Sequence, residues 1–204
     1  DPESLLASKG GGVAFLSYTT HALAENRHGL IVDVHTTPAT GTAEREAALV
    51  MVKRSVKPAR GSRKPTVAAD RGYDTAKFVG ALTALGIAPH VAAKTQGSAV
   101  PEHIKTTEGY RVSLRRRKMI EEAFGWIKTV ALQERTRFRG IGRVGFAFTF
   151  AAAAYNLVRL PKLLAEAKAA CRAEGGKLER AIAAAVAPAG ISVTTKEIES
   201  YSNT

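Results

Sequence analysis

The chain has 204 residues, which is enough for one domain with a hydrophobic core and too few for two full-sized domains. Its 30 Lys and Arg residues against 18 Asp and Glu give a net charge of +12 and a pI near 10.1, which indicates a polyanionic partner such as nucleic acid. The single cysteine, Cys171, excludes an internal disulfide and every metal site built from a cysteine cluster.

The N-terminal residues lack the pattern of a signal peptide, so we expect a cytoplasmic, nucleoid-associated protein. The longest uncharged stretch, Val144 to Val158, has 15 residues, whereas a membrane span needs about 20. We therefore interpret this stretch as a buried helix and expect no membrane contact. The chain begins at Asp1 without a Met, and a piece of a longer protein is one expectation for it.

Residues 13–24 and 29–37 are rich in β-branched and aromatic residues, and the turn-like sequence ENRH lies between them, so they predict an antiparallel hairpin. After a break at TPATGT, residues 43–56 predict a helix. Thr42 is a suitable N-cap for it, and two glutamates lie in its first turn, where the helix dipole favours negative charge.

Residues 66–70, TVAAD, form a short apolar run that ends in Asp70. Gly72 permits a sharp turn in the following RGYD, and Asp74 can cap the next helix, which is predicted over residues 75–85. The run IAPHVA then predicts a second strand. This order is typical of a βαβ unit with parallel strands, and ligands bind outside the carboxyl ends of such strands, where Asp70 lies.

The rest of the chain alternates helical and irregular patterns. Residues 94–113 are polar and predict a loop over this site. Residues 145–160 predict the buried helix, and Pro161 marks a break before an Ala-rich helical extension at residues 161–187. Residues 188–204 have little to bury and are expected to be disordered.

The stretch RRRKMIEEAFGWIK, residues 115–128, predicts an amphipathic helix. With Arg117 at zero and about 100° per residue, Glu121 lies at about 40° and Lys128 at about 20°, whereas Glu122 lies farther round toward solvent. Glu121 is therefore held between two cations at the edge of the core. The apolar stripe beside it faces the core and consists of Ile120, Ala123, Phe124, Ile127 and Ala131.

Nearby cations lower the pKa of a carboxyl group and keep it ionised. Mg²⁺ takes oxygen ligands, usually one or two carboxylates with phosphate oxygens and water, so Asp70 and Glu121 are candidate catalytic residues and metal ligands, for Mg²⁺ or Mn²⁺. Each has a simpler alternative. Asp70 could cap a turn, and Glu121 could form an i to i+4 ion pair with Arg117 worth ~0.3 kcal/mol.

The positive charge is concentrated near these carboxylates. Residues 111–143 contain 10 Lys or Arg and 3 Glu, which is +7 of the total +12. Any one of these cations is readily explained as part of a solvated face, but the cluster favours binding of DNA phosphates. The candidate DNA-binding residues are Arg115, Arg116, Arg117, Lys128, Arg137 and Arg139.

Two motifs resemble those of DDE transposases of the insertion-sequence 4/5 superfamily. They are ADRGYD and the spacing of Arg117, Glu121 and Lys128, and the resemblance extends over roughly residues 1–165. The family motif also has a tyrosine three positions before the arginine, where this chain has Leu114.

The resemblance implies an α/β fold, a ribonuclease H-like mixed sheet with flanking helices, with residues 1–160 as a partial catalytic domain. It implies that Asp70 is the second catalytic aspartate and Glu121 the catalytic glutamate. The family's first catalytic aspartate lies on a strand upstream of a segment like DPESLLASKGGG, and neither Asp1 nor Asp33 takes its role. We therefore expect the sheet to lack its first strand and this chain alone to be inactive.

The expected function is DNA transposition, in which the protein cleaves and joins double-stranded DNA at insertion-sequence ends and at a target, with a homodimer as one possible assembly. Two alternatives stay open. One is a catalytically inactive, DNA-binding remnant of a transposase, and the other is a related nuclease of ribonuclease H-like fold.

Overall fold

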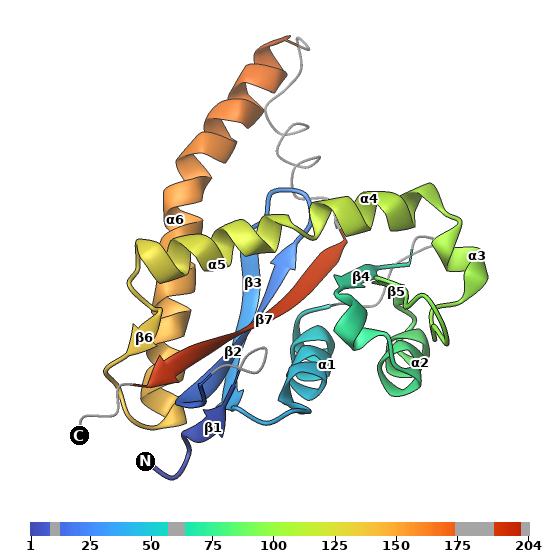
Figure 1. Ribbon diagram of the computed structural model, residues 1–204. Coiled ribbons are helices and arrows are strands. Elements are labelled where there is room, and N and C mark those ends of the chain that lie inside the picture. The colour runs from blue at the N-terminus through green and yellow to red at the C-terminus, as the bar shows by residue number, and fades with distance from the viewer. Residues whose placement is uncertain (9–12, 57–63, 174–189, 201–204) are drawn as a thin grey trace.

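The computed structural model describes residues 1–8, 13–56, 64–173 and 190–200 (Figure 1). Among them, seven strands form one sheet, and helices cover both of its faces. The strands are β1 (Leu5–Ala7), β2 (Phe15–Glu25), β3 (Ile31–Pro38), β4 (Thr66–Ala69), β5 (Ala88–Val91), β6 (Arg135–Thr136) and β7 (Ile191–Ser200). The helices are α1 (Ala43–Ser55), the 3-10 turn η1 (Arg71–Tyr73), α2 (Ala76–Ala84), α3 (Glu102–Lys105), α4 (Glu108–Arg116), α5 (Met119–Thr129) and α6 (Ile141–Ala173).

The predicted hairpin and βαβ unit are both present. Strands β2 and β3 pair antiparallel, with a register shift at Leu23 and Ala24. Strands β4 and β5 pair in parallel, joined by α2. Gly86 follows α2 with a φ of +71°, a conformation that glycine adopts without strain at the end of a helix.

Strand β7 contradicts the expectation of disorder over residues 191–200, whereas residues 188–189 and 201–204 of that predicted tail lie outside the described part. It lies in the middle of the sheet, antiparallel to β2 over nine paired positions and parallel to β4 at Ile191 and Ser192. The sheet order is thus β1-β2-β7-β4-β5, with β3 also on β2 and β6 on β7. Val193 is buried, so the segment does have a side chain to bury. Strand β7 also covers the edge of β2 that would otherwise be unpaired.

Two hydrophobic clusters lie on opposite faces of the sheet. Leu23 belongs to the cluster that also contains side chains of α1 and α2, whereas its neighbours Ala22 and Ala24 belong to the one formed with α5 and α6. This separation follows from strand geometry, because successive side chains point to opposite faces. The sheet therefore lies between α1 and α2 on one side and α5 and α6 on the other.

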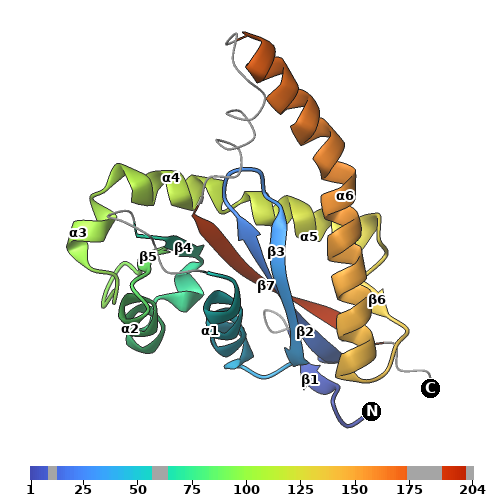
Figure 2. The ribbon, with the colours of Figure 1, turned by 180° about the vertical axis from the view of Figure 1, so that it is seen from behind.

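Helix α6 differs from the predicted buried helix in two respects. It runs through Pro161 without interruption to Ala173, so no break separates the helix from the expected extension, of which residues 174–187 lie outside the described part. Only one of its faces is buried. By length and composition, Ile141–Ala169 could cross a membrane; 28% of its most apolar window is buried, and the helix extends beyond the sheet (Figures 1 and 2).

Candidate active site

The site begins at Asp70, directly after the last residue of β4. Its backbone is extended and leads into η1, where Tyr73 N–H donates to the carbonyl of Asp70 at 3.0 Å. The carboxylate projects past the carboxyl end of the strand and its side chain is 53% exposed. The βαβ pattern therefore gave the correct position for this aspartate.

Arg117 joins the two predicted carboxylates. Its Nη1 lies 2.5 Å from Asp70 Oδ1 and 3.9 Å from Glu121 Oε1, while its own side chain is only 14% exposed. Nε and Nη1 are buried and make no hydrogen bond within the described residues, so the contact with Asp70 is one of charge. Asp70 and Glu121, which are 51 positions apart in sequence, thus contact the same guanidinium nitrogen.

The predicted helix is divided here. The chain forms α4 and then α5, and Arg117 and Lys118 between them keep α-helical dihedral angles. Because these angles continue the helical path, Arg117 and Glu121 still face each other one turn apart. The structure also shows that α4 begins at Glu108, with Thr107 accepting from Tyr110 N–H, so residues 102–113 are mostly helical and not the predicted loop.

Glu121 and Glu122 have different partners, as the helical phasing predicted, but similar exposure. Glu121 faces Arg117, whereas Glu122 lies 3.6 Å from Arg159 of α6. Their side chains are 57% and 66% exposed, so Glu121 is not more enclosed by the core, and Glu122 is not an unpartnered surface acid. The predicted apolar stripe is correct, with Ile120 and Ile127 almost fully buried.

The carboxylates offer part of a site for a hard cation. Arg117 contacts one oxygen of each, which leaves Asp70 Oδ2 and Glu121 Oε2 without a partner in the described residues, and both side chains are open to water. Two carboxylate donors with water and phosphate oxygens suit Mg²⁺. Within the described ranges, no third His, Cys, Asp or Glu joins them in a metal-binding group.

Asp74, the last residue of ADRGYD, has a role that differs from the predicted helix cap. Thr75 caps α2, whereas Asp74 is buried and accepts hydrogen bonds from Lys94 N–H at 2.7 Å and Ala99 N–H at 2.8 Å. Burial alone would raise its pKa, but these bonds and one from Ser98 outweigh burial and hold the pKa below its ordinary value. Asp74 therefore anchors the segment after β5 beside the end of β4.

The two aspartates that were given no catalytic role have structural partners. Asp33 is bound by Arg54 at 2.5 Å and by the hydroxyl of Ser55 at 2.7 Å, which ties the end of α1 to β3. Asp1 accepts from the hydroxyl of Tyr18 and from Gly140 N–H. Among the described residues, neither Asp33 nor Asp1 contacts Asp70 or Glu121.

Apart from Arg117, which contacts the two carboxylates, the predicted DNA-binding cations divide into two groups along the chain from α4 to residue 139. Arg115 lies 3.6 Å from Glu108, and Arg116 donates to the carbonyl of Arg27 in the β2–β3 turn, so both have partners within the protein. The other group lies in and after the last turn of α5, and its first member is about 10 Å along the helix from Glu121 at 1.5 Å per residue. It consists of Lys128, Arg137 and Arg139.

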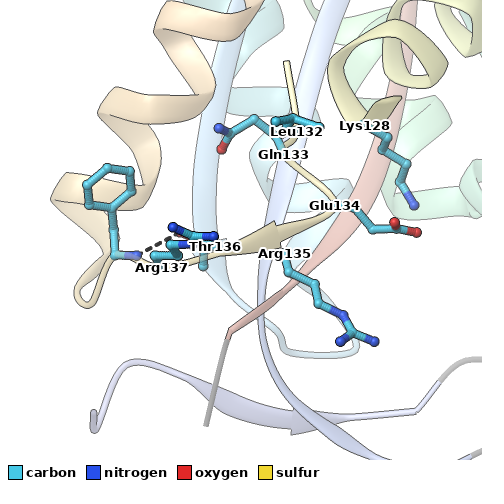
Figure 3. A pocket seen from close by; sticks show the side chains of 8 residues that line it. Lys128, Leu132, Gln133, Glu134, Arg135, Thr136 and Arg137 are labelled. Carbon is cyan, nitrogen blue, oxygen red and sulfur yellow. Dashed lines mark hydrogen bonds between the residues drawn. The ribbon is translucent and has the colours of Figure 1, made fainter. Parts of the chain in front are cut away.

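A hollow of about 470 Å³ lies at this far end (Figure 3). Lys128 from α5 and Arg137 line it, together with Arg135 of β6, a cation absent from the predicted set. Phe138, beside Arg137, is 49% exposed, and its N–H donates to Thr136 Oγ1 at 3.1 Å. The basic composition of residues 135–139 was the signal that could have added Arg135. Arg139 is exposed nearby.

Residues 6–157 match the family model described as "Transposase DDE domain". Comparisons with curated proteins and with solved structures gave no match. The matched range contains Asp70, Arg117, Glu121 and the basic hollow, and it ends within α6.

Proposed function

Because this chain belongs to the family of DDE transposase domains, we propose that its site performs divalent-metal-dependent cleavage and strand transfer at the ends of an insertion sequence. The motif ADRGYD and the spacing of Arg117, Glu121 and Lys128 support membership of the insertion-sequence 4/5 group within that family. The observation that carries the proposal is the meeting of Asp70, Arg117 and Glu121 at the carboxyl end of β4.

Asp70 and Glu121 would hold Mg²⁺ or Mn²⁺ through the oxygens that Arg117 does not contact. A metal ion bound there supplies polarisation of a phosphodiester and a water molecule of lowered pKa. Arg117 is a positioning residue. Its buried guanidinium fixes both carboxylates relative to each other, and its charge offsets the repulsion between them.

The basic group at the end of α5 would bind the DNA backbone. Lys128, Arg135 and Arg137 line one hollow, and their charges can contact phosphates of a duplex whose scissile bond lies at Asp70 and Glu121. The separation of about 10 Å along α5 between Glu121 and Lys128 means that these cations contact other phosphates than the one being cleaved. The proposed partners are double-stranded DNA and a second copy of the chain, in the cytoplasm and associated with the nucleoid.

The test compares Glu121→Gln with Glu122→Gln in cleavage of DNA carrying element ends and, separately, in Mn²⁺ binding followed by calorimetry. Glu121→Gln removes a metal-ligand charge and should reduce both, while leaving DNA affinity within about twofold. Glu122→Gln is the matched control, because it is a neighbour of similar exposure that pairs with Arg159 instead. Equal losses in the two variants would contradict the assignment of Glu121.

A second candidate function is DNA binding without cleavage, as in an inactive remnant of a transposase. It is favoured by the absence of a third ligand beside Asp70 and Glu121 in the described residues, because a two-metal mechanism needs further carboxylate oxygens. A supercoiled-plasmid nicking assay with Mg²⁺ and with Mn²⁺ separates the two functions. Nicking that is lost in Asp70→Ala supports the enzyme, and DNA binding with no nicking supports the remnant.

A further inference from the structure

Strand β7 brings a further oxygen-bearing side chain to the level of Asp70 (Figure 1). It pairs in parallel with β4, and Ser192 lies opposite Ala68. Because Asp70 follows β4 with an extended backbone, the same register carried two residues further places Thr194 opposite Asp70. Neighbouring strands lie about 4.8 Å apart, so these two side chains start from adjacent points of the sheet.

Thr194 and Asp70 also share a face of the sheet. Val193 and Ala69, the residues before them, both belong to the hydrophobic cluster on the side of α1 and α2. Because successive side chains of a strand point to opposite faces, Thr194 and Asp70 point to the other face. The partner of Thr194 on β2 is Ala22, which belongs to the cluster formed with α5 and α6. Thr194 therefore lies between Ala22 and Asp70 on the face that α5 covers.

The hydroxyl of Thr194 is buried and makes no hydrogen bond with any described residue. The residue is only 6% exposed. A buried hydroxyl without a partner destabilises a fold, so most such groups are satisfied by protein, by water or by a bound ion. Arg117, which contacts Asp70, likewise has two buried nitrogens without a hydrogen bond to the described part of the chain. Unsatisfied polar atoms thus gather around Asp70, where a polar ligand can satisfy them.

A threonine hydroxyl suits the hard cation that Asp70 and Glu121 can hold. Mg²⁺ takes oxygen donors, and Ser or Thr hydroxyls are among its ligands at phosphate-binding sites. The hydroxyl is neutral, so it adds a donor without adding to the repulsion between the two carboxylates. Asp70 and Glu121 are 53% and 57% exposed, so they form the open side of the site and Thr194 its base.

We propose that Thr194 Oγ1 is the third oxygen donor of the metal site, supplied by β7. The inference rests on the proposed function, because it extends the assignment of Asp70 and Glu121 as metal ligands. It is compatible with the lack of a third His, Cys, Asp or Glu among the described residues, since a hydroxyl belongs to none of these types. Strand β7 then has two roles: it closes the sheet between β2 and β4, and it positions a ligand beside Asp70.

The test is calorimetric titration of the chain with Mn²⁺ for the parent, Thr194→Val, Thr194→Ser and Asp70→Ala. Thr194→Val removes the hydroxyl and keeps the branched shape, so Mn²⁺ affinity should fall roughly tenfold, whereas Thr194→Ser keeps the hydroxyl and should change it less than about twofold. In metal-free buffer, Thr194→Val should unfold at a higher urea concentration than the parent, because an unsatisfied buried hydroxyl is gone. Ser192→Ala is the matched control. Ser192 lies two positions earlier on the same face, its hydroxyl donates to Asn26, and its loss should leave Mn²⁺ affinity unchanged.

Thr194→Asp is the opposite change. A buried carboxylate there repels Asp70 until a cation binds, so Mn²⁺ should raise the urea midpoint of this variant more than that of the parent. Unchanged Mn²⁺ affinity in Thr194→Val, with binding lost in Asp70→Ala, would overturn this inference and leave the proposed function standing. Equal losses in Thr194→Val and Ser192→Ala would also overturn it, because a general disturbance of β7 would explain both. Binding retained in Asp70→Ala would refute the metal site itself and the proposed function with it.

Discussion

Asp74→Asn tests whether ADRGYD contains one structural and one catalytic aspartate. The carboxylate of Asp74 accepts from the backbone N–H groups of Lys94 and Ala99 in a buried position. A hydrogen bond to an ionised group contributes about 1.5–3 kcal/mol. Asparagine keeps one acceptor oxygen and turns an NH₂ group toward the other N–H, so the loss is one such bond plus an unsatisfied buried donor, about 3 kcal/mol in total.

The free energy of unfolding should be measured in urea from the fluorescence of Trp126, the single tryptophan. Because folding lowers the pKa of Asp74, its carboxylate stabilises the fold above the ordinary pKa of about 4, and this contribution is lost as the pH falls through the folded value. The difference in the free energy of unfolding between parent and variant should therefore be largest at pH 7 and should decrease below about pH 4.

Asp70→Asn, at the exposed position, should lower the free energy of unfolding by no more than ~1 kcal/mol. A loss of less than about 0.5 kcal/mol in the free energy of unfolding for Asp74→Asn, which is the usual effect of a surface substitution, would refute this division of roles. So would an equal loss for Asp70→Asn.

Three further predictions concern the fold and DNA binding. Gly190→Ala should destabilise the protein by about 1–3 kcal/mol and reduce hydrogen-exchange protection of β7, because its Cβ would overlap a threonine hydroxyl of β4; Gly80→Ala, with open space around it, should be neutral or stabilising. Asn156→Ala should cost about 2 kcal/mol in urea unfolding, since it removes two hydrogen bonds of 2.8 and 2.9 Å to the backbone of β3. If Lys128 and Arg137 contact phosphates, their double Ala variant should reduce the slope of log affinity against log salt by about 1.8, measured by fluorescence anisotropy with duplex DNA, and an unchanged slope would exclude both contacts.

Features set by neighbouring residues were predictable from the sequence. The hairpin, the βαβ unit and the pairing of Arg117 with Glu121 depend on periodicity, turn residues and helical spacing, and all three are present. The early start of α4 also had a local signal, because Thr107 and the following glutamate form a typical helix N-terminus. These features depend on residues that are close together in the chain, so a single sequence is enough to predict them.

Features set by distant residues were not predictable in the same way. The role of Asp74 depends on two N–H groups 20 and 25 residues later, which no spacing rule identifies. Strand β7 is polar enough to resemble a disordered tail, although Ile191 and Val193 alternate with polar residues as a strand requires. Helix α6 continues past Pro161, on an exposed side of the helix, so the local preference of proline was overridden.

The position of β7 has a consequence for synthesis of the protein. This strand is translated after every other described element, and yet it lies between β2 and β4. On the ribosome, the β2–β3 hairpin and the β4–β5 pair can each form early, but both keep an edge of unpaired N–H and C=O groups until residues 191–200 emerge. Joining them requires contacts between β7 and residues 124 positions away in β4 and at least 166 positions away in β2, which is a slow, non-local step. During that interval the β7 segment of one nascent chain can insert beside the β2 of another, so crowded polysomes should favour strand-exchanged aggregates over correctly closed sheets.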